Sequence, residues 1–140
     1  MFTRLSHVTL FVKDYDEAIR YYTEVIGLIL RGDNPVGSGV RWVTVGVPGQ
    51  PDLDIVLYQA GESPGTHARS TGKQTLIFAS DDCRKDVERL RSRGVAITLE
   101  PEAVRWGVQA VFEDMYGNSH VIVEPPPSGR ATETETSDGS

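Results

Sequence analysis

The sequence contains two copies of one pattern, and this internal repeat limits the folds that the chain can adopt. The stretch RLSHVTLFVKD near the start matches KQTLIFASDD in the second half. His7 lies seven residues before Asp14, and Thr75 lies seven residues before Asp82, so the two copies are 68 positions apart. A period of this length is too long for a solenoid and indicates a duplicated half-domain.

Two further pairs of segments match in the same order along the chain. GVRWVTV begins at Gly39 and GVQAVFE begins at Gly107, again 68 positions apart. IVLYQ and HVIVE end the two copies, which sets Gln59 against Glu124. Both copies therefore run from one apolar strand to another through similar intervening segments.

Each copy predicts one helix among several strands. Residues 5–12 alternate between polar and apolar, which is typical of a strand with two different faces. DEAIRYYTEVIG has apolar residues at helical spacing, Asp14 or Asp16 can cap its start, and Gly27 is a natural stop. Asp81 or Asp82 can cap the second helix in the same way. Strands are expected at residues 28–31, 40–47 and 53–59 in the first copy, with GDNPVGSG as a loop, and at 75–80 and 95–99 in the second.

The repeat predicts an α+β fold built from two tandem β-α-β-β-β modules. Both modules belong to a single expected domain over residues 4–125. The segment between them is rich in Gly, Ser and Pro, and the C-terminal end has almost nothing to bury. The expected divisions are module one at 4–59, a linker at 60–73, module two at 74–125 and a disordered tail at 126–140.

Composition excludes several classes of partner. The net charge is −6 and no Lys/Arg run is present to neutralise phosphates, so nucleic acid is not an expected partner. Cys83 is the single cysteine, which excludes an intramolecular disulfide and fits a reducing compartment. The start lacks a signal-peptide pattern, and no stretch approaches the roughly 20 apolar residues of a membrane helix. A cytoplasmic location without membrane attachment is therefore expected.

Three segments resemble the vicinal oxygen chelate superfamily, which has the glyoxalase/bleomycin resistance/extradiol dioxygenase fold. They are SHVTLFVKDYDEAIRYYTEVIGL, FASDDCRKDVERLRSRGV and WGVQAVFEDMYGNSHVIVE, and the resemblance covers about residues 4–125. It implies that each module forms a curled four-stranded sheet and that the two sheets form an eight-stranded cup. In this family the cup encloses a small-molecule ligand and often a divalent metal, and a homodimer is usual.

The resemblance also assigns four metal-ligand positions, of which this chain keeps one. They fall on His7 and Val56 in module one and on Thr75 and Val121 in module two. A divalent ion needs three or four converging N, O or S donors. Glu124 lies three residues beyond Val121 and has the opposite strand parity, so it is a weak substitute. We expect no metal cofactor. A divalent metal bound by His7 and Glu124 is the alternative.

The lining of the expected pocket follows from the same positions and from strand parity. His7 is also the candidate catalytic base, because imidazole titrates near neutrality. Trp42 and Trp106 can stack on a planar ligand, or can pack in a core or dimer interface. The expected lining residues are His7, Thr9, Phe11, Trp42, Val56, Tyr58, Thr75, Trp106 and Val121.

Three other residues have a structural and a functional interpretation. Glu124 is interpreted as a solvated strand end in preference to a ligand or base. Cys83 stands at a predicted helix N-terminus, which lowers a thiol pKa, but the neighbouring aspartates oppose thiolate formation. His120 has the wrong parity for the cavity and is expected to lie at the surface or to pack.

Two classes of function remain open from the sequence. The first is a metal-free protein that binds or sequesters an aromatic or cationic organic compound, as bleomycin-resistance proteins of the resembled family do. The second is an enzyme of the same fold, a lyase, isomerase or dioxygenase, that uses a divalent metal or His7 as base. The fold alone does not choose between them.

Overall fold

The computed structural model describes residues 1–59 and 73–127. The chain divides into two compact units, Met1–Lys73 and Gln74–Ser140, and each unit is described by itself. Apart from residue 73, the expected linker lies outside the described residues, and so does the expected tail from residue 128 onward.

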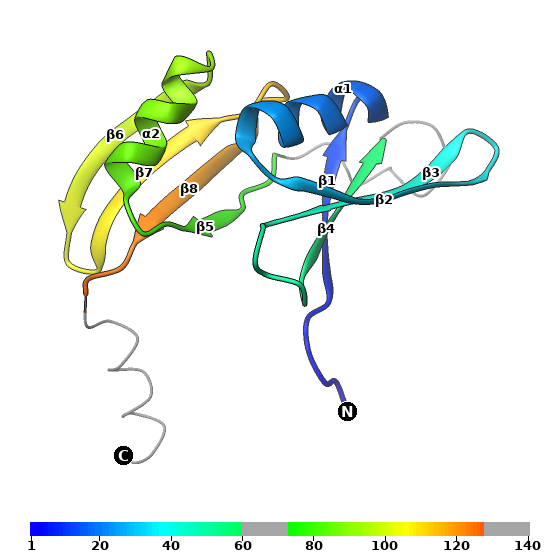
Figure 1. The fold of residues 1–140 in the computed structure, drawn as a ribbon, viewed down its shortest axis with the longest axis horizontal. Helices are drawn as coiled ribbons and strands as arrows, with labels where there is room; N and C mark the ends of the chain where they lie inside the picture. The colour runs from blue at the N-terminus through cyan, green and yellow to red at the C-terminus, as the bar shows by residue number, and fades with distance from the viewer. Residues whose placement is uncertain (60–72, 128–140) are drawn as a thin grey trace. The chain divides into compact units, whose positions relative to one another are not determined.

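The first unit has one helical segment and one mixed sheet (Figure 1). The sheet order is β1-β4-β3-β2, in which β1 and β4 are parallel and the other neighbours are antiparallel. The helical segment runs without a break from an α-helix into a π-helix. The elements are β1 (His7–Val12), α1 (Tyr15–Arg20), η1 (Tyr21–Ile26), β2 (Ile29–Gly37), β3 (Val40–Gly46) and β4 (Asp54–Gln59).

The second unit repeats the same element order and topology. Its sheet order is β5-β8-β7-β6, again with one parallel pair, β5 and β8. The elements are β5 (Ile77–Ala79), α2 (Cys83–Ser92), β6 (Ala96–Val104), β7 (Gly107–Glu113) and β8 (Ser119–Glu124). The predicted α+β class and the two β-α-β-β-β modules are confirmed, each with an open four-stranded sheet.

Each helical segment begins after an aspartate that caps its first turn. The carboxylate of Asp14 accepts a hydrogen bond from the backbone N–H of Glu17 at 2.9 Å, and Asp82 accepts one from Lys85 at 3.1 Å. These bonds satisfy N–H groups that have no partner inside the helix. Of the alternatives that the sequence left open, the structure therefore selects Asp14 and Asp82. At the other end, Gly27 has a positive φ of 103°, as its expected role as a helix stop requires.

Strand β2 is longer than predicted. The segment GDNPVGSG was expected to form a loop, but residues 32–37 of it continue the strand because they pair with β3. The register shifts between Leu30 and Gly32 and between Pro35 and Gly37, so the strand accommodates its turn-forming residues through bulges. Pro35 is tolerated because β2 is an edge strand of the sheet.

In the first unit, the helical segment covers one face of the sheet and forms the core with it. Side chains from β1, β3 and β4 that point to this face are almost completely buried. The core of the first unit includes Leu10, Val12, Ala18, Tyr22, Val43, Val45 and Leu57. Alternation along the strands sends the intervening residues to the opposite, helix-free face, which is where the candidate site lies.

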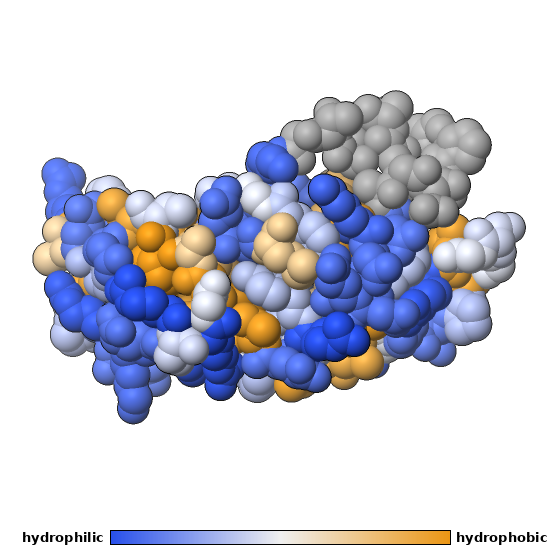
Figure 2. Space-filling view, turned by 90° about the horizontal axis from the view of Figure 1, so that it is seen from above, coloured by the Kyte–Doolittle hydropathy of each residue, from blue (hydrophilic) through white to orange (hydrophobic). Residues whose placement is uncertain are grey.

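Some apolar side chains remain at the surface. Val36 and Trp42 in the first unit and Ile77 and Trp106 in the second are exposed. A space-filling view shows hydrophobic patches separated by hydrophilic residues (Figure 2). None of the described helices is long and apolar enough to cross a membrane.

Candidate functional site

The helix-free face of the first sheet gathers residues from β1 and β4 in register. His7 lies opposite Asp54, Thr9 opposite Val56, and each pair faces the same side of the sheet. On β3, Thr44 lies opposite Val56 and therefore belongs to this face as well. The parallel pairing of β1 with β4 thus brings two chain segments, almost 50 positions apart in sequence, to one surface.

A cavity of about 420 Å³ opens on this face, and we call it the His7 hollow. Its volume is within the range of small-molecule sites. It combines five of the nine residues expected to line a pocket with three that the sequence did not indicate. The lining residues are His7, Thr9, Val36, Val40, Arg41, Trp42, Val56 and Tyr58. Phe11, which was also expected there, has its ring 6.2 Å from that of Tyr58.

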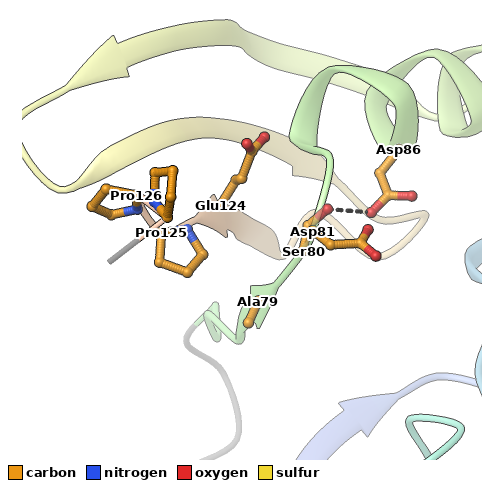
Figure 3. Close-up of a pocket in the computed structure, with 8 residues that line it drawn as sticks. Ala79, Ser80, Asp81, Asp86, Glu124, Pro125 and Pro126 are labelled. Carbon is orange, nitrogen blue, oxygen red and sulfur yellow. Dashed lines mark hydrogen bonds between the residues drawn. The ribbon is translucent and has the colours of Figure 1, made fainter. Parts of the chain in front are cut away.

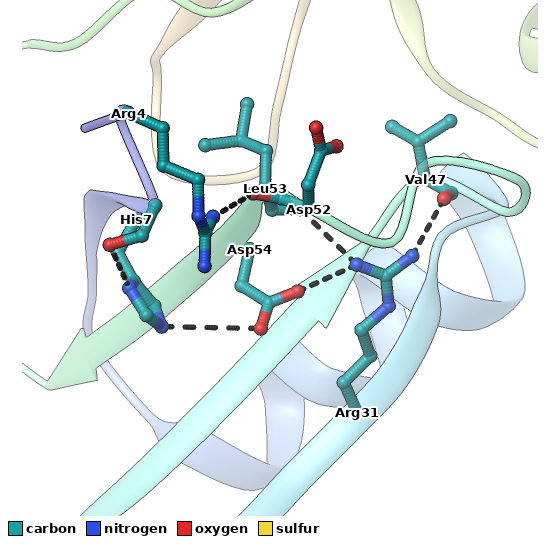
Figure 4. A network of polar contacts seen from close by, with 8 residues as sticks. Arg4, His7, Arg31, Val47, Asp52, Leu53 and Asp54 are labelled. Carbon is teal, nitrogen blue, oxygen red and sulfur yellow. Dashed lines mark hydrogen bonds and ion pairs between the residues drawn. The ribbon is translucent and has the colours of Figure 1, made fainter.

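The imidazole of His7 has a different neighbour on each side. Its Nδ1 lies 2.9 Å from the hydroxyl oxygen of Ser6, and its Nε2 lies 4.0 Å from Oδ2 of Asp54 (Figure 4). The ring of Trp42 lies 5.6 Å away, tilted by 59°. The side chain of His7 is 42% exposed, so it is accessible to a molecule that enters the hollow.

Asp54 is held in place by Arg31 from β2. The Nη1 of Arg31 donates a hydrogen bond to Oδ1 of Asp54 at 2.6 Å, and the same guanidinium donates to the carbonyls of Leu53 and Val47 (Figure 4). A Cβ on Gly46 would collide with this guanidinium, so the absence of a side chain there makes room for it. The sequence analysis missed Asp54, although its parity with Val56 on the last strand was a usable signal.

Arg41 is one of the lining residues, and its guanidinium has partners on β2 and at the start of α1. Its guanidinium donates to both carboxylate oxygens of Asp33, at 2.7 and 3.1 Å, and lies 3.0 Å from the carboxylate of Asp16. It also stacks over the ring of Tyr15 at 5.1 Å. The hydrogen bonds from Arg41 hold the pKa of Asp33 below its ordinary value. These contacts fix the position of Arg41, and nothing in the sequence pattern indicated them.

The remaining predicted lining residues belong to the second unit. Thr75 is exposed and precedes β5, which begins two residues later than the predicted strand. Val121 lies on β8 opposite Ile77 and Val111. The indole N–H of Trp106 donates to Oε1 of Gln109 at 3.2 Å. For these three residues, a role in the ligand pocket stays a prediction.

The donors near His7 do not match a divalent metal chelate. Of the four positions that the family resemblance assigns, Val56 and Val121 carry no donor atom and Thr75 only a hydroxyl. Among the described residues, no three His, Cys, Asp or Glu side chains converge. Asp54 is the carboxylate beside His7, and its other oxygen is already paired with Arg31. We therefore derive no chemistry through a metal.

Glu124 has a structural contact that the sequence analysis missed. Its carboxylate accepts a hydrogen bond from the backbone N–H of Cys83 at the start of α2, at 2.8 Å. It lines an open hollow of about 720 Å³ at that helix end, together with Ser80, Asp81 and Asp86 (Figure 3). Since Ser80 donates to Asp86 at 2.6 Å, two of these carboxylates bind groups of their own chain.

The thiol of Cys83 is buried against the acidic helix start. Burial raises its pKa above the ordinary value, and the charge of Glu124 raises it further. A thiolate is the reactive form of cysteine, so this position does not suit a nucleophile. The sequence-based interpretation and the geometry agree on this point.

His120 is part of a buried polar network in the second unit. Its Nδ1 accepts a hydrogen bond from the backbone N–H of Leu76 at 3.0 Å, and its Nε2 lies 3.4 Å from Oδ2 of Asp114. Both side chains are fully buried. Asp114 also accepts from the N–H groups of Tyr116 and Asn118 in the turn before β8. His120 therefore packs inside the unit, as its strand parity indicated.

Repeated β-α-β-β-β units, with a ligand-sized hollow on a helix-free face, define a protein of the vicinal oxygen chelate class. The model of the Glyoxalase/Bleomycin resistance protein/Dioxygenase superfamily matches residues 4–122. The chain belongs to this superfamily.

Individual relatives include both a binding protein and an enzyme. The chain is 34% identical to YurT of Bacillus subtilis, an uncharacterized protein, over 83% of this chain and 94% of YurT. It is 31% identical to the crystal structure of TnmS3, an antibiotic binding protein from Streptomyces sp. CB03234, with a TM-score of 0.74 and coverage of 89% and 98%. It is 27% identical to lactoylglutathione lyase GLX1 of Arabidopsis thaliana, over 89% of this chain and 45% of that enzyme.

Proposed function

We propose that this protein binds a small aromatic compound in the His7 hollow and holds it without converting it. The observation that carries the proposal is the hollow itself, in which Trp42 and Tyr58 stand beside His7 over an apolar floor at Val56. Such a mixture of aromatic, apolar and a few polar groups is typical of sites for organic ligands. The similarity to an antibiotic binding protein supports the same class of function.

An aromatic ligand suits the hollow better than a cationic one. Among the described lining residues there is no carboxylate; the carboxylate of Asp54 lies beside the hollow, next to His7, and is already paired with Arg31. The charge of Arg41 is offset by its partners Asp33 and Asp16, which are not lining residues, so a cation would find no carboxylate in the lining to bind it. Trp42, by contrast, is 46% exposed, so its ring can stack on a planar molecule.

A metal-free enzyme is the second candidate, and the pairing of His7 with Asp54 favours it. A carboxylate near an imidazole can hold the ring in one orientation, which helps it to act in general acid–base catalysis. The family includes enzymes, and the similarity to a lyase keeps this candidate in view. It differs from the first in one respect: the bound compound would be released as a different molecule.

Ligand binding is tested by titrating the purified protein with a panel of aromatic compounds while following tryptophan fluorescence. Saturable binding, with the compound recovered unchanged by mass spectrometry, supports a binding protein. Conversion of the compound, lost in His7→Ala, would move the assignment to an enzyme. If no aromatic compound in the panel binds saturably, the proposal is contradicted.

We also propose that the protein is a homodimer, as the family resemblance implies. The test is the molar mass from light scattering during size-exclusion chromatography, over a range of protein concentrations. A mass near twice the 15.4 kDa of one chain supports the dimer. A mass of one chain at all concentrations contradicts it.

A further inference from the structure

A polar gap lies at the edge of the His7 hollow, between the imidazole of His7, which lines the hollow, and the carboxylate of Asp54 beside it. Nε2 of His7 and Oδ2 of Asp54 face each other at 4.0 Å, which is too long for a direct hydrogen bond. Arg31 binds the other carboxylate oxygen and keeps Asp54 from moving toward the imidazole (Figure 4). The carboxylate is 26% exposed and the imidazole 42% exposed, so a third group can reach both atoms.

The surroundings indicate which atom of the gap donates and which accepts. The Ser6 hydroxyl lies 2.9 Å from Nδ1 of His7, where it can donate to that nitrogen. When Nδ1 accepts from Ser6, a neutral imidazole carries its proton on Nε2, the nitrogen that faces Asp54. The gap then has an N–H donor on one side and a carboxylate acceptor on the other, which together call for a group that accepts and donates at once.

We infer that the ligand of the His7 hollow carries a hydroxyl group on its aromatic ring, and that this hydroxyl bridges Nε2 of His7 and Oδ2 of Asp54. The hydroxyl oxygen accepts from His7 and its proton is donated to Asp54, while the ring lies against Trp42. This inference rests on the proposed function, because it names the chemical class of the compound bound at that site.

Other common ligand groups satisfy only half of this gap. An ammonium group can donate to Asp54 but has no lone pair to accept the Nε2 proton. A carboxylate can accept from His7 but is repelled by the charge of Asp54. A phenol does both, and its hydrogen bond to a carboxylate is of the strong, charge-assisted kind. An ether of the same size accepts from His7 and leaves Asp54 without a donor.

The test compares 2-naphthol with 2-methoxynaphthalene, which has the same rings but no hydroxyl proton. Dissociation constants are measured from the chemical-shift changes of backbone amides and tryptophan indoles of the ¹⁵N-labelled protein. We expect 2-naphthol to bind about tenfold more tightly, since one charge-assisted hydrogen bond distinguishes the two probes. Equal dissociation constants would overturn the inference and leave the proposed function standing. Failure of both probes to bind would contradict the proposed function itself.

Two variants test whether His7 and Asp54 cause the preference for 2-naphthol over 2-methoxynaphthalene. In Asp54→Asn the amide oxygen can still accept from Arg31, while the NH₂ group faces His7 and no longer accepts the hydroxyl proton. We expect the tenfold preference to fall to about twofold or less, and His7→Phe to have a similar effect without disturbing Arg31. The control is Asp52→Asn, an exposed residue before β4, which should keep the full preference. An unchanged preference in Asp54→Asn and His7→Phe would overturn the inference.

Discussion

The carboxylate of Glu124 accepts a hydrogen bond at 2.8 Å from the backbone N–H of Cys83, the first residue of α2. Its repeat partner makes the same contact in the first unit, where Oε1 of Gln59 accepts from the N–H of Tyr15 at 3.0 Å. Each unit therefore uses the last residue of its final strand to bind the first N–H of its helix. A helix N-terminus leaves such N–H groups without internal partners.

Replacing Glu124 with alanine should lower the free energy of unfolding by about 1 kcal/mol, because the first N–H of α2 loses its acceptor. Glu124→Gln should lose only a few tenths of a kcal/mol, because a glutamine can accept the same hydrogen bond, as Gln59 does in the first unit. Only the negative charge near the helix N-terminus is removed. Urea unfolding monitored by circular dichroism measures both values. The control is Glu102→Ala, exposed on β6, which should be neutral. Equal losses in Glu124→Ala and Glu102→Ala would contradict this account.

Cys83 should resist alkylation in the folded protein and react in urea, because its thiol is buried and its pKa is raised. Iodoacetamide labelling at neutral pH, followed by mass spectrometry, measures the two rates. A folded-state pKa above the unfolded value means that this thiol contributes stability below about pH 8.5 and that the contribution is lost as pH rises further. Cys83→Ala should therefore flatten the alkaline decline of stability. Equally fast labelling with and without urea would contradict the burial.

The buried pair of His120 and Asp114 should be among the most sensitive positions of the second unit. His120→Leu removes the acceptor of the Leu76 N–H and leaves the Asp114 carboxylate short of a partner, which should cost about 3 kcal/mol. Urea unfolding measures the loss. The matched control is His7→Leu, an exposed histidine in the first unit, for which we expect a loss below about 1 kcal/mol. Similar losses in both variants would argue against the buried network.

The two tryptophans should differ in their effect on ligand affinity. Trp42→Ala removes an aromatic wall of the His7 hollow and should weaken binding of an aromatic compound about tenfold. Trp106 is not among the described residues that line this hollow, so Trp106→Ala should leave affinity within about twofold. Calorimetric titration of both variants separates the cases. If Trp42→Ala leaves the affinity for the aromatic compound unchanged, the ligand binds elsewhere.

The purified protein should retain no stoichiometric divalent metal. The protein would be incubated with Mn, Fe, Co, Ni and Zn, separated from excess metal and analysed for its elements, with His7→Ala treated in parallel. We expect no stoichiometric metal, because the assigned positions at Val56 and Val121 offer no donor atom. Near-stoichiometric metal that disappears in His7→Ala would reverse this expectation and favour a metal-dependent lyase or dioxygenase.

Much of the local structure was predictable because it depends on neighbours in the sequence. Strand alternation predicted β1, β3 and β4, and it placed Thr9 and Phe11 on the face of His7 and Tyr58 on the face of Val56, since side chains of a strand alternate by a fixed period. Helix starts were predictable because a cap lies within three residues of the N–H that it binds. The boundaries of β2 were wrong because pairing with β3 outweighed the local preference of its Gly and Pro residues for a turn.

The sequence by itself determined the two repeated modules and the parity of their strands, and it put Val56, Thr75 and Val121 at three of the four metal-ligand positions that the family resemblance implies. Only the tertiary structure decided that Arg31 fixes Asp54 beside His7 and that Arg41 joins Asp33 at the wall of the hollow. Each of these contacts joins residues on two different strands, so it depends on the register of the sheet and on the bulges in β2. A periodic pattern specifies which face a side chain occupies, but it does not specify which partner lies across the sheet from it.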